Sequence, residues 1–83
     1  FGRYDVMLKP LRKEDTGIIL EFKVHDPKEE SSLEETAAAA LKQIDEKKYD
    51  RTLLDLGLEK ENIKKYGFAF EGKKVLIGES SPL

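Results

Sequence analysis

The feature that most constrains the fold is a short apolar run, residues 18–24, which carries two charged residues inside it. The run is rich in β-branched and aromatic residues and is the most apolar window of the chain, which predicts a central β-strand. Glu21 and Lys23 lie two residues apart, so they share one face of that strand. We expect apolar neighbours to cover both faces. An uncompensated charge there costs several kcal/mol, so both residues need partners.

A second strand is predicted just before the central one. Residues 4–9 alternate between apolar and polar side chains and stop at Pro10. A charged segment that ends at Gly17 then forms a turn, which would join the two strands as an antiparallel pair. This pairing would bring Asp5 toward the charged face of the central strand.

The middle of the chain is predicted to be helical. Ser32 and Glu35 form a capping-box pattern, and apolar residues at helical spacing then continue to about residue 48. A shorter helical segment is expected at residues 50–56, where Gly57 stops it.

A closing hairpin is predicted from two strands, residues 66–70 and 73–77, which flank a Glu71-Gly72 loop. The expected fold class is α/β, a small mixed sheet with a crossover helix. Residues 1–77 would form this domain, and residues 78–83, which have no pattern, would form a flexible tail.

Composition narrows the function classes. The 83 residues allow one small domain, and the absence of cysteine excludes disulfides, thiolate zinc sites and a cysteine nucleophile. The 15 Lys and Arg against 17 Asp and Glu give a net charge of −2, which argues against a plain DNA-binding domain. No apolar run approaches the roughly 20 residues of a membrane span, and a cytoplasmic location is expected.

The charged residues of the two paired strands suggest chemistry. If Asp5 faces Glu21 and Lys23, two carboxylates and one ammonium converge at one edge of the sheet. Mg²⁺ is typically held by one or two carboxylates together with substrate phosphate, so this set suits metal-assisted phosphodiester hydrolysis. A lysine nearby can stabilise charge on the phosphorus. The alternative is an amphipathic strand that shows Glu21 and Lys23 to solvent as a weak surface pair.

The flank of the predicted helix offers two further polar side chains. Gln43 and Lys47 are one helical turn apart and face the same border of the sheet. They could reach a substrate phosphate or the carboxylates. The alternative is an ordinary helix flank with a lysine that extends toward solvent.

Four segments of the chain occur in the same order in a known group of proteins: residues 2–6, 18–24, 40–44 with 47–49, and 66–70 with 72–75. They resemble the C-terminal nuclease-like domain of bacterial and archaeal AAA-ATPase-like proteins, in the PD-(D/E)XK nuclease superfamily. The resemblance covers roughly residues 2–77. It implies a nuclease that acts on nucleic acid, with DNA the expected substrate, and an AAA-ATPase-like domain as partner.

The resemblance also implies roles for single residues. Asp5 and Glu21 would be metal ligands for Mg²⁺ or Mn²⁺, and Lys23 would position the attacking water or stabilise the transition state. Gln43, with Tyr49 as the weaker match, looks like the glutamine–tyrosine element on the helix that follows in one branch of the superfamily.

The superfamily core runs α-β-β-β-α-β, so its first helix and first strand would precede Phe1. The chain is therefore expected to be a fragment with a partial restriction-endonuclease-like core, either catalytically incomplete or completed by forming a homodimer. Tyr4 stands where the superfamily name has proline. The competing hypothesis is a non-catalytic module that uses the same fold for dimerisation or for docking on an AAA-ATPase-like partner.

Several other residues are given structural interpretations. His25 is expected to be a loop residue outside the site, and Tyr66, Phe68 and Phe70 to be core packing under a helix. The acidic run at residues 26–35 would repel a nucleic-acid backbone and should face away from a substrate.

Overall fold

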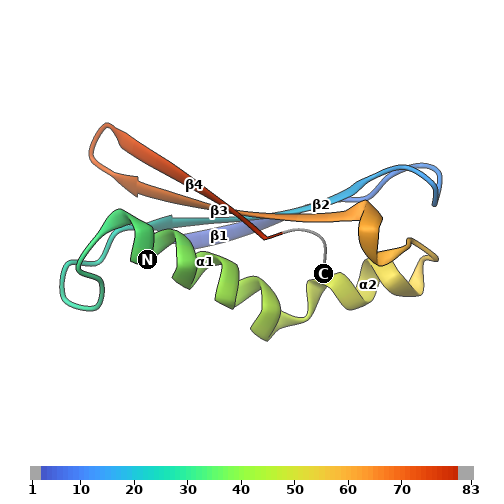
Figure 1. Cartoon of the computed structure of the whole chain (residues 1–83), viewed down its shortest axis with the longest axis horizontal. Helices are drawn as coiled ribbons and strands as arrows, with labels where there is room; N and C mark the ends of the chain where they lie inside the picture. Colours follow the sequence, from blue (N-terminus) through green and yellow to red (C-terminus); the bar gives the residue numbers. More distant parts are fainter. Residues whose placement is uncertain (1–2, 81–83) are drawn as a thin grey trace.

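The structure is a computed structural model that describes residues 3–80. Within this range four strands and two α-helices follow one another in the order β-β-α-α-β-β, with a 3-10 helix before the third strand (Figure 1). The elements are β1 (Arg3–Leu8), β2 (Gly17–Val24), α1 (Leu33–Lys47), α2 (Tyr49–Asp55), η1 (Lys60–Asn62), β3 (Ile63–Glu71) and β4 (Lys74–Ser80). Neither α-helix of this range has the length and apolar character that a membrane crossing needs.

The strands form one mixed sheet in the order β1-β2-β3-β4. β2 and β3 are parallel, whereas β1 and β4 run antiparallel to their neighbours. Parallel neighbours cannot be joined by a tight turn, and α1 and α2 form the crossover between them. The predicted fold class, a small α/β domain with a mixed sheet and a crossover helix, is confirmed.

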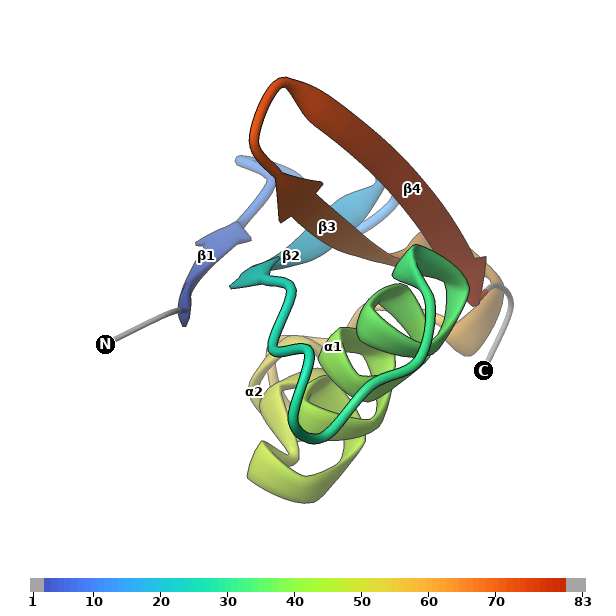
Figure 2. The same cartoon turned by 90° about the vertical axis from the view of Figure 1, so that its left-hand side faces the viewer.

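Both helices lie on the same face of the sheet, as Figure 2 shows. α1 lies close to the sheet because the residues between them are small. A Cβ atom on Gly67 of β3 would be 2.7 Å from the carbonyl oxygen of Ala37 and 3.0 Å from Cβ of Ala40. Glycine at this position therefore sets how near α1 can approach β3.

The opposite face of the sheet is covered by no other part of residues 3–80. The prediction that β2 is covered on both sides is therefore wrong for the described chain. The prediction that Tyr66, Phe68 and Phe70 pack under a helix is also wrong. In β3 the residues that alternate with them, Gly67 and Ala69, are buried beneath α1, so the three rings point to the uncovered side.

Aromatic rings from three strands meet on this uncovered side, which we call the aromatic face (Tyr4, Phe22, Phe68 and Phe70). The ring centroid of Phe22 is 4.8 Å from that of Tyr4 and 4.9 Å from that of Phe68. The ring of Phe70 is 6.1 Å from Phe22. Tyr4 is nevertheless 60 % exposed and the other three residues are half-buried, so the rings contact one another but are only partly shielded from water.

The hydrophobic core fills the space between the sheet and the helices, and its buried members are Ile19, Ile44, Leu53, Leu58 and Ile63. Met7 and Tyr49 pack against this cluster. The core therefore anchors α1 and α2 against β2 and β3, with Met7 of β1 at its border.

The ends of α1 follow the predicted capping chemistry with one change. Ser32 Oγ accepts a hydrogen bond from the Glu35 N–H at 3.2 Å, as the capping box predicts. The Glu35 carboxylate bonds to the N–H and hydroxyl of Ser31 instead of returning to Ser32. At the other end Lys48 adopts a left-handed conformation with φ of 56°, and α2 begins at the next residue, Tyr49.

Two predictions about the last strands need correction. Glu71 pairs with Lys74, so the two-residue loop is Gly72-Lys73 and not Glu71-Gly72. Gly72 is the first of these two loop residues, and its φ of 59° is a value that glycine adopts without strain. Residues 78–80 belong to β4, where Ser80 pairs with Lys65, so a flexible tail is wrong for them; residues 81–83 lie outside the described residues.

Candidate functional site

Asp5 and Glu21 face each other directly across the β1–β2 pair. Opposite residues of an antiparallel pair point to the same side of the sheet, and here that side is the one that carries the helices. The Glu21 side chain is fully buried, whereas 28 % of the Asp5 side chain is exposed. This register agrees with the predicted pairing of Asp5 with the charged face of β2, whereas the Lys23 ammonium that was expected beside the two carboxylates binds Glu30.

The ammonium group that joins these carboxylates comes from Lys47. Its Nζ donates to Asp5 Oδ2 at 2.6 Å and lies 3.9 Å from Glu21 Oε1. Tyr49 donates its hydroxyl to the same Asp5 oxygen at 2.9 Å, and the Lys47 ammonium lies 5.6 Å from the centre of the Tyr49 ring. The pair of carboxylates therefore already holds a cation.

Charge states at this point follow from the contacts. The hydrogen bond from Lys47 lowers the pKa of Asp5, against a smaller opposing effect of burial. The same bond raises the pKa of Lys47. Burial, followed by the bond to Asp5, raises the pKa of Tyr49. At neutral pH Asp5 is thus a carboxylate, Lys47 an ammonium and Tyr49 a neutral donor.

The local sequence explains why Lys47 and Tyr49 reach Asp5. Lys47 follows the buried Ile44 by three residues, so its side chain leaves α1 on the side that faces the sheet. The left-handed Lys48 then turns the chain, and Tyr49 packs against the core at the start of α2. Two polar side chains on either side of this bend are thereby directed at β1.

Lys23 lies on the same face as Glu21, but its ammonium binds another carboxylate. Its Nζ donates to Glu30 Oε2 at 2.6 Å, and the two side chains are 14 % and 8 % exposed. Glu30 Oε1 also accepts from the Asp26 N–H at 2.8 Å and from the Thr36 hydroxyl at 3.0 Å. Burial acts to raise the pKa of Glu30, but these three donors together lower it to about 2.

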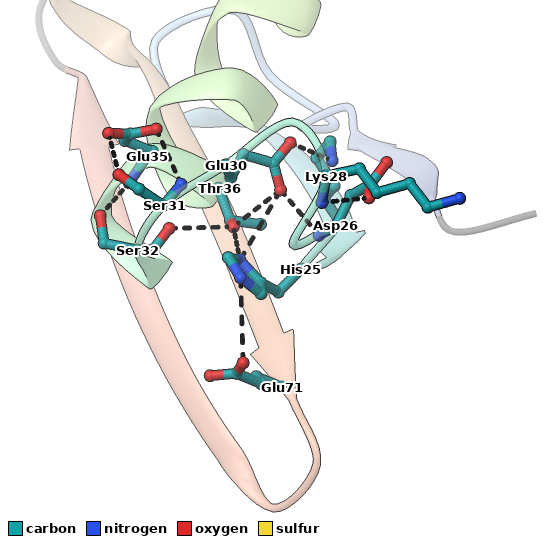
Figure 3. A network of polar contacts seen from close by, with 10 residues as sticks. His25, Asp26, Lys28, Glu30, Ser31, Ser32, Glu35, Thr36 and Glu71 are labelled. Carbon is teal, nitrogen blue, oxygen red and sulfur yellow. Dashed lines mark hydrogen bonds and ion pairs between the residues drawn. The ribbon is translucent and has the colours of Figure 1, made fainter.

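Figure 3 shows how the surroundings of Glu30 hold it in place. His25 Nδ1 is 2.7 Å from the Thr36 hydroxyl and 3.7 Å from Glu30, and its Nε2 is 3.8 Å from Glu71 Oε2. The cluster ties the end of β2 to the first turn of α1 and to the end of β3. Sequence analysis missed Glu30, because nothing in the acidic run distinguishes it from its exposed neighbours.

Gln43 lies on α1, one turn before Lys47, and is half-buried. The structure thus brings Asp5, Glu21, Lys47 and Tyr49 together, and it places the Lys23 ammonium with Glu30. The sequence left open whether Lys47 reaches the carboxylates or extends toward solvent. Its spacing from Ile44 was the observation that favoured the first, because it puts Lys47 at the edge of the apolar stripe.

The carboxylate pair fits a divalent cation by its chemistry. Among residues 3–80 no group of three or more His, Cys, Asp or Glu side chains gathers as a metal cage. Mg²⁺ and Mn²⁺ prefer oxygen ligands, and Mg²⁺ often takes only one or two carboxylates, with water and substrate phosphate filling the other positions. The ammonium of Lys47 at Asp5 and Glu21 shows that this pair accommodates positive charge.

Comparison with known proteins gives one family. A family model described as PD-(D/E)XK nuclease superfamily matches residues 1–80, which is nearly the whole chain. No curated protein and no solved structure gives a significant match. The match spans both strands of the carboxylate pair and the helix that carries Gln43 and Lys47.

Proposed function

We propose that this chain, which belongs to the PD-(D/E)XK nuclease superfamily, is a divalent-metal-dependent nuclease domain that hydrolyses phosphodiester bonds in nucleic acid, with DNA the expected substrate. The observation that carries the proposal is the Asp5–Glu21 pair. These carboxylates lie opposite each other, one of them fully buried, and a cationic group lies at both. Burying a carboxylate is costly, so its retention in a core strand favours a role that needs the charge.

Asp5 and Glu21 would hold Mg²⁺ or Mn²⁺. When bound, such an ion polarises a phosphoryl oxygen and lowers the pKa of a coordinated water. Tyr49 would keep Asp5 oriented through its 2.9 Å hydrogen bond. Gln43, on the helix above this edge of the sheet, would orient the cluster.

Lys23 would stabilise negative charge that develops on the phosphate. It follows Glu21 by two residues on the same face, at a distance of about 6.5 Å along the strand. The 2.6 Å contact with Glu30 keeps its ammonium in one place. Glu30 would therefore act as a positioning residue for Lys23.

The proposal is tested by Mn²⁺ binding, measured by calorimetry, on the chain and on Asp5→Asn and Glu21→Gln. Both substitutions keep the side-chain size and remove one carboxylate charge. Glu46→Gln is the matched control, because it removes the same charge from an exposed position next to Lys47. We expect one site in the chain and in the control, and binding at least tenfold weaker in each site variant.

Cleavage assays with single- and double-stranded DNA and with RNA then test the reaction. Activity that requires Mg²⁺ or Mn²⁺, and that Glu21→Gln and Lys23→Met abolish, would support the proposal. A chain that binds no Mn²⁺, or variants that bind it as well as the control does, would refute it.

A second candidate function is a non-catalytic module for dimerisation or for docking to an AAA-ATPase-like domain. The observation that favours it is the aromatic face, where Tyr4 is 60 % exposed at one edge of the sheet and Ile77, which pairs with Phe68, is 54 % exposed at the other. Contiguous exposed apolar surface of this kind marks interaction sites. Analytical ultracentrifugation of the chain and of Phe22→Ser tests self-association: this second function predicts a dimer that the substitution dissociates.

A further inference from the structure

We propose that Lys47 is the resident counter-cation of the Asp5–Glu21 pair, and that a divalent metal loads this pair only by displacing the Lys47 ammonium. The inference rests on the proposed function, and it adds how occupation of that site is controlled. Lys47 and the metal are alternative occupants of one position.

The contacts of Lys47 support this role. Its ammonium donates to Asp5 at 2.6 Å, which is the length of a strong charge-assisted hydrogen bond. It lies 3.9 Å from Glu21, within ion-pair range of a carboxylate that is fully buried. One ammonium thus lies within ion-pair distance of two carboxylates on neighbouring strands, which is where a bound metal ion would also lie.

Simultaneous occupation is unfavourable on electrostatic grounds. Asp5 Oδ2 already accepts from Lys47 and from Tyr49, so two donors occupy this oxygen. A divalent ion between the carboxylates would lie within a few ångströms of the ammonium, where like charges repel strongly because this edge of the sheet is partly shielded from water. One of the two cations has to leave.

Lys47 can leave without disturbing the fold. It is in the last turn of α1, and its side chain is 32 % exposed and flexible. Tyr49 cannot follow, because it packs against the hydrophobic core. Metal loading would therefore release Lys47 toward solvent while Tyr49 keeps its bond to Asp5.

The two other lysines that approach carboxylates on this side of the sheet behave differently. Lys23 and Lys65 have side chains that are 14 % and 6 % exposed, and each binds a single carboxylate, Glu30 and Asp45 respectively. Neither has a second carboxylate within ion-pair distance in the described residues. These lysines serve as internal references, since metal loading should leave them in place.

The test compares Mn²⁺ affinity of the chain with that of Lys47→Met, Lys47→Arg and Lys42→Met, by calorimetry. Removing the competing cation should tighten binding about tenfold or more in Lys47→Met, given the usual strength of a charged hydrogen bond. Lys47→Arg keeps a cation and should stay near the parent chain. Lys42→Met removes the same charge from an exposed position of the same helix, and should change affinity by no more than about twofold.

A second measurement uses the unaltered chain, in case Lys47→Met does not fold. The ammonium groups of ¹⁵N-labelled lysines are followed by NMR while diamagnetic Mg²⁺ is added. We expect the Lys47 signal to move toward that of an exposed lysine, while the signals of Lys23 and Lys65 stay unchanged.

The outcomes separate this inference from the proposed function. If the parent chain binds Mn²⁺ and Lys47→Met binds it equally or more weakly, the displacement is refuted and the metal site stands. Binding of Mg²⁺ with an unmoved Lys47 signal refutes it in the same way. If neither the chain nor Lys47→Met binds metal, the site fails, and the proposed function and this inference fail together.

Discussion

Replacing Glu30 by glutamine should remove a large part of the stability of this small domain. The carboxylate is 8 % exposed and accepts from Lys23, from the Asp26 N–H and from Thr36. These bonds lower its pKa from 4.5 to about 2, a gap that corresponds to about 3 kcal/mol of folding stability at neutral pH. Glu30→Gln also leaves the Lys23 ammonium without its carboxylate, a change that typically costs about 3–5 kcal/mol.

The sign of the pH dependence follows from the same values. Because the folded state holds the Glu30 proton less tightly than the unfolded state, the contribution is complete above about pH 4.5 and is lost as the pH falls toward 2. About 2 kcal/mol of it should be gone by pH 3. Asp5 and Glu35, whose pKa values are also lowered, add to the acid sensitivity of the chain.

The assay is urea unfolding, followed by circular dichroism between pH 7 and pH 3. The chain is compared with Glu30→Gln and with Glu29→Gln, which removes a neighbouring, exposed charge. Glu30→Gln should lower the free energy of unfolding by about 3 kcal/mol at pH 7 and should lose less on acidification. A Glu30→Gln variant that unfolds at the urea concentration of the parent chain, with the same pH dependence, would refute the reasoning.

Three further predictions concern local structure. Ser32→Ala removes the acceptor for the Glu35 N–H at the start of α1 and should cost about 1 kcal/mol in urea unfolding, with Ser31→Ala as comparison. Gly67→Ala places a Cβ 2.7 Å from the Ala37 carbonyl oxygen and should cost about 1–3 kcal/mol; an unchanged melting temperature would contradict the close approach of α1. Phe22→Ser removes the ring that contacts both Tyr4 and Phe68, so the aromatic face loses apolar surface and should bind less of the dye ANS. Unaltered ANS fluorescence would show that this face is not an accessible apolar surface.

Much of the fold was predictable because it depends on local patterns. The alternation of residues 4–9 and the turn that ends at Gly17 indicate an antiparallel pair, which brings Asp5 to the charged face of the next strand; the structure shows the register, with Asp5 opposite Glu21. The capping pattern at Ser32 places the start of α1 correctly. Each of these features is set by neighbours in the sequence.

The orientation of the sheet was not predictable in the same way. Alternation in β3 separates the rings from Gly67 and Ala69, but alternation alone does not say which set faces the helix. Because the rings are large and apolar, the sequence suggested that they form the core. The close approach of α1 instead requires the small residues on the side of β3 that faces the helix. The small residues of α1 itself, Ala37 and Ala40, were the signal that could have decided the question.

The partners of the charged residues depended on tertiary structure. Asp5 is more than forty positions away from both Lys47 and Tyr49 in the sequence. Lys47 reaches it from the last turn of α1, and Tyr49 reaches it only because the left-handed Lys48 turns the chain between the two helices. Likewise, Lys23 binds a carboxylate from the loop before α1, a segment whose sequence pattern carries no contact information. Residue types therefore indicated a charged site, but they did not identify the lysine that occupies it.

The most direct test of the central claim locates a paramagnetic ion on the chain. Mn²⁺ is added in substoichiometric amounts to the ¹⁵N-labelled protein, and broadening of the amide signals is recorded residue by residue. The account predicts that the amides of Asp5 and Glu21 broaden first, and that Glu21→Gln abolishes the effect. Broadening centred on the exposed acidic residues of the loop before α1, or equal broadening in Glu21→Gln, would contradict a metal site at the carboxylate pair.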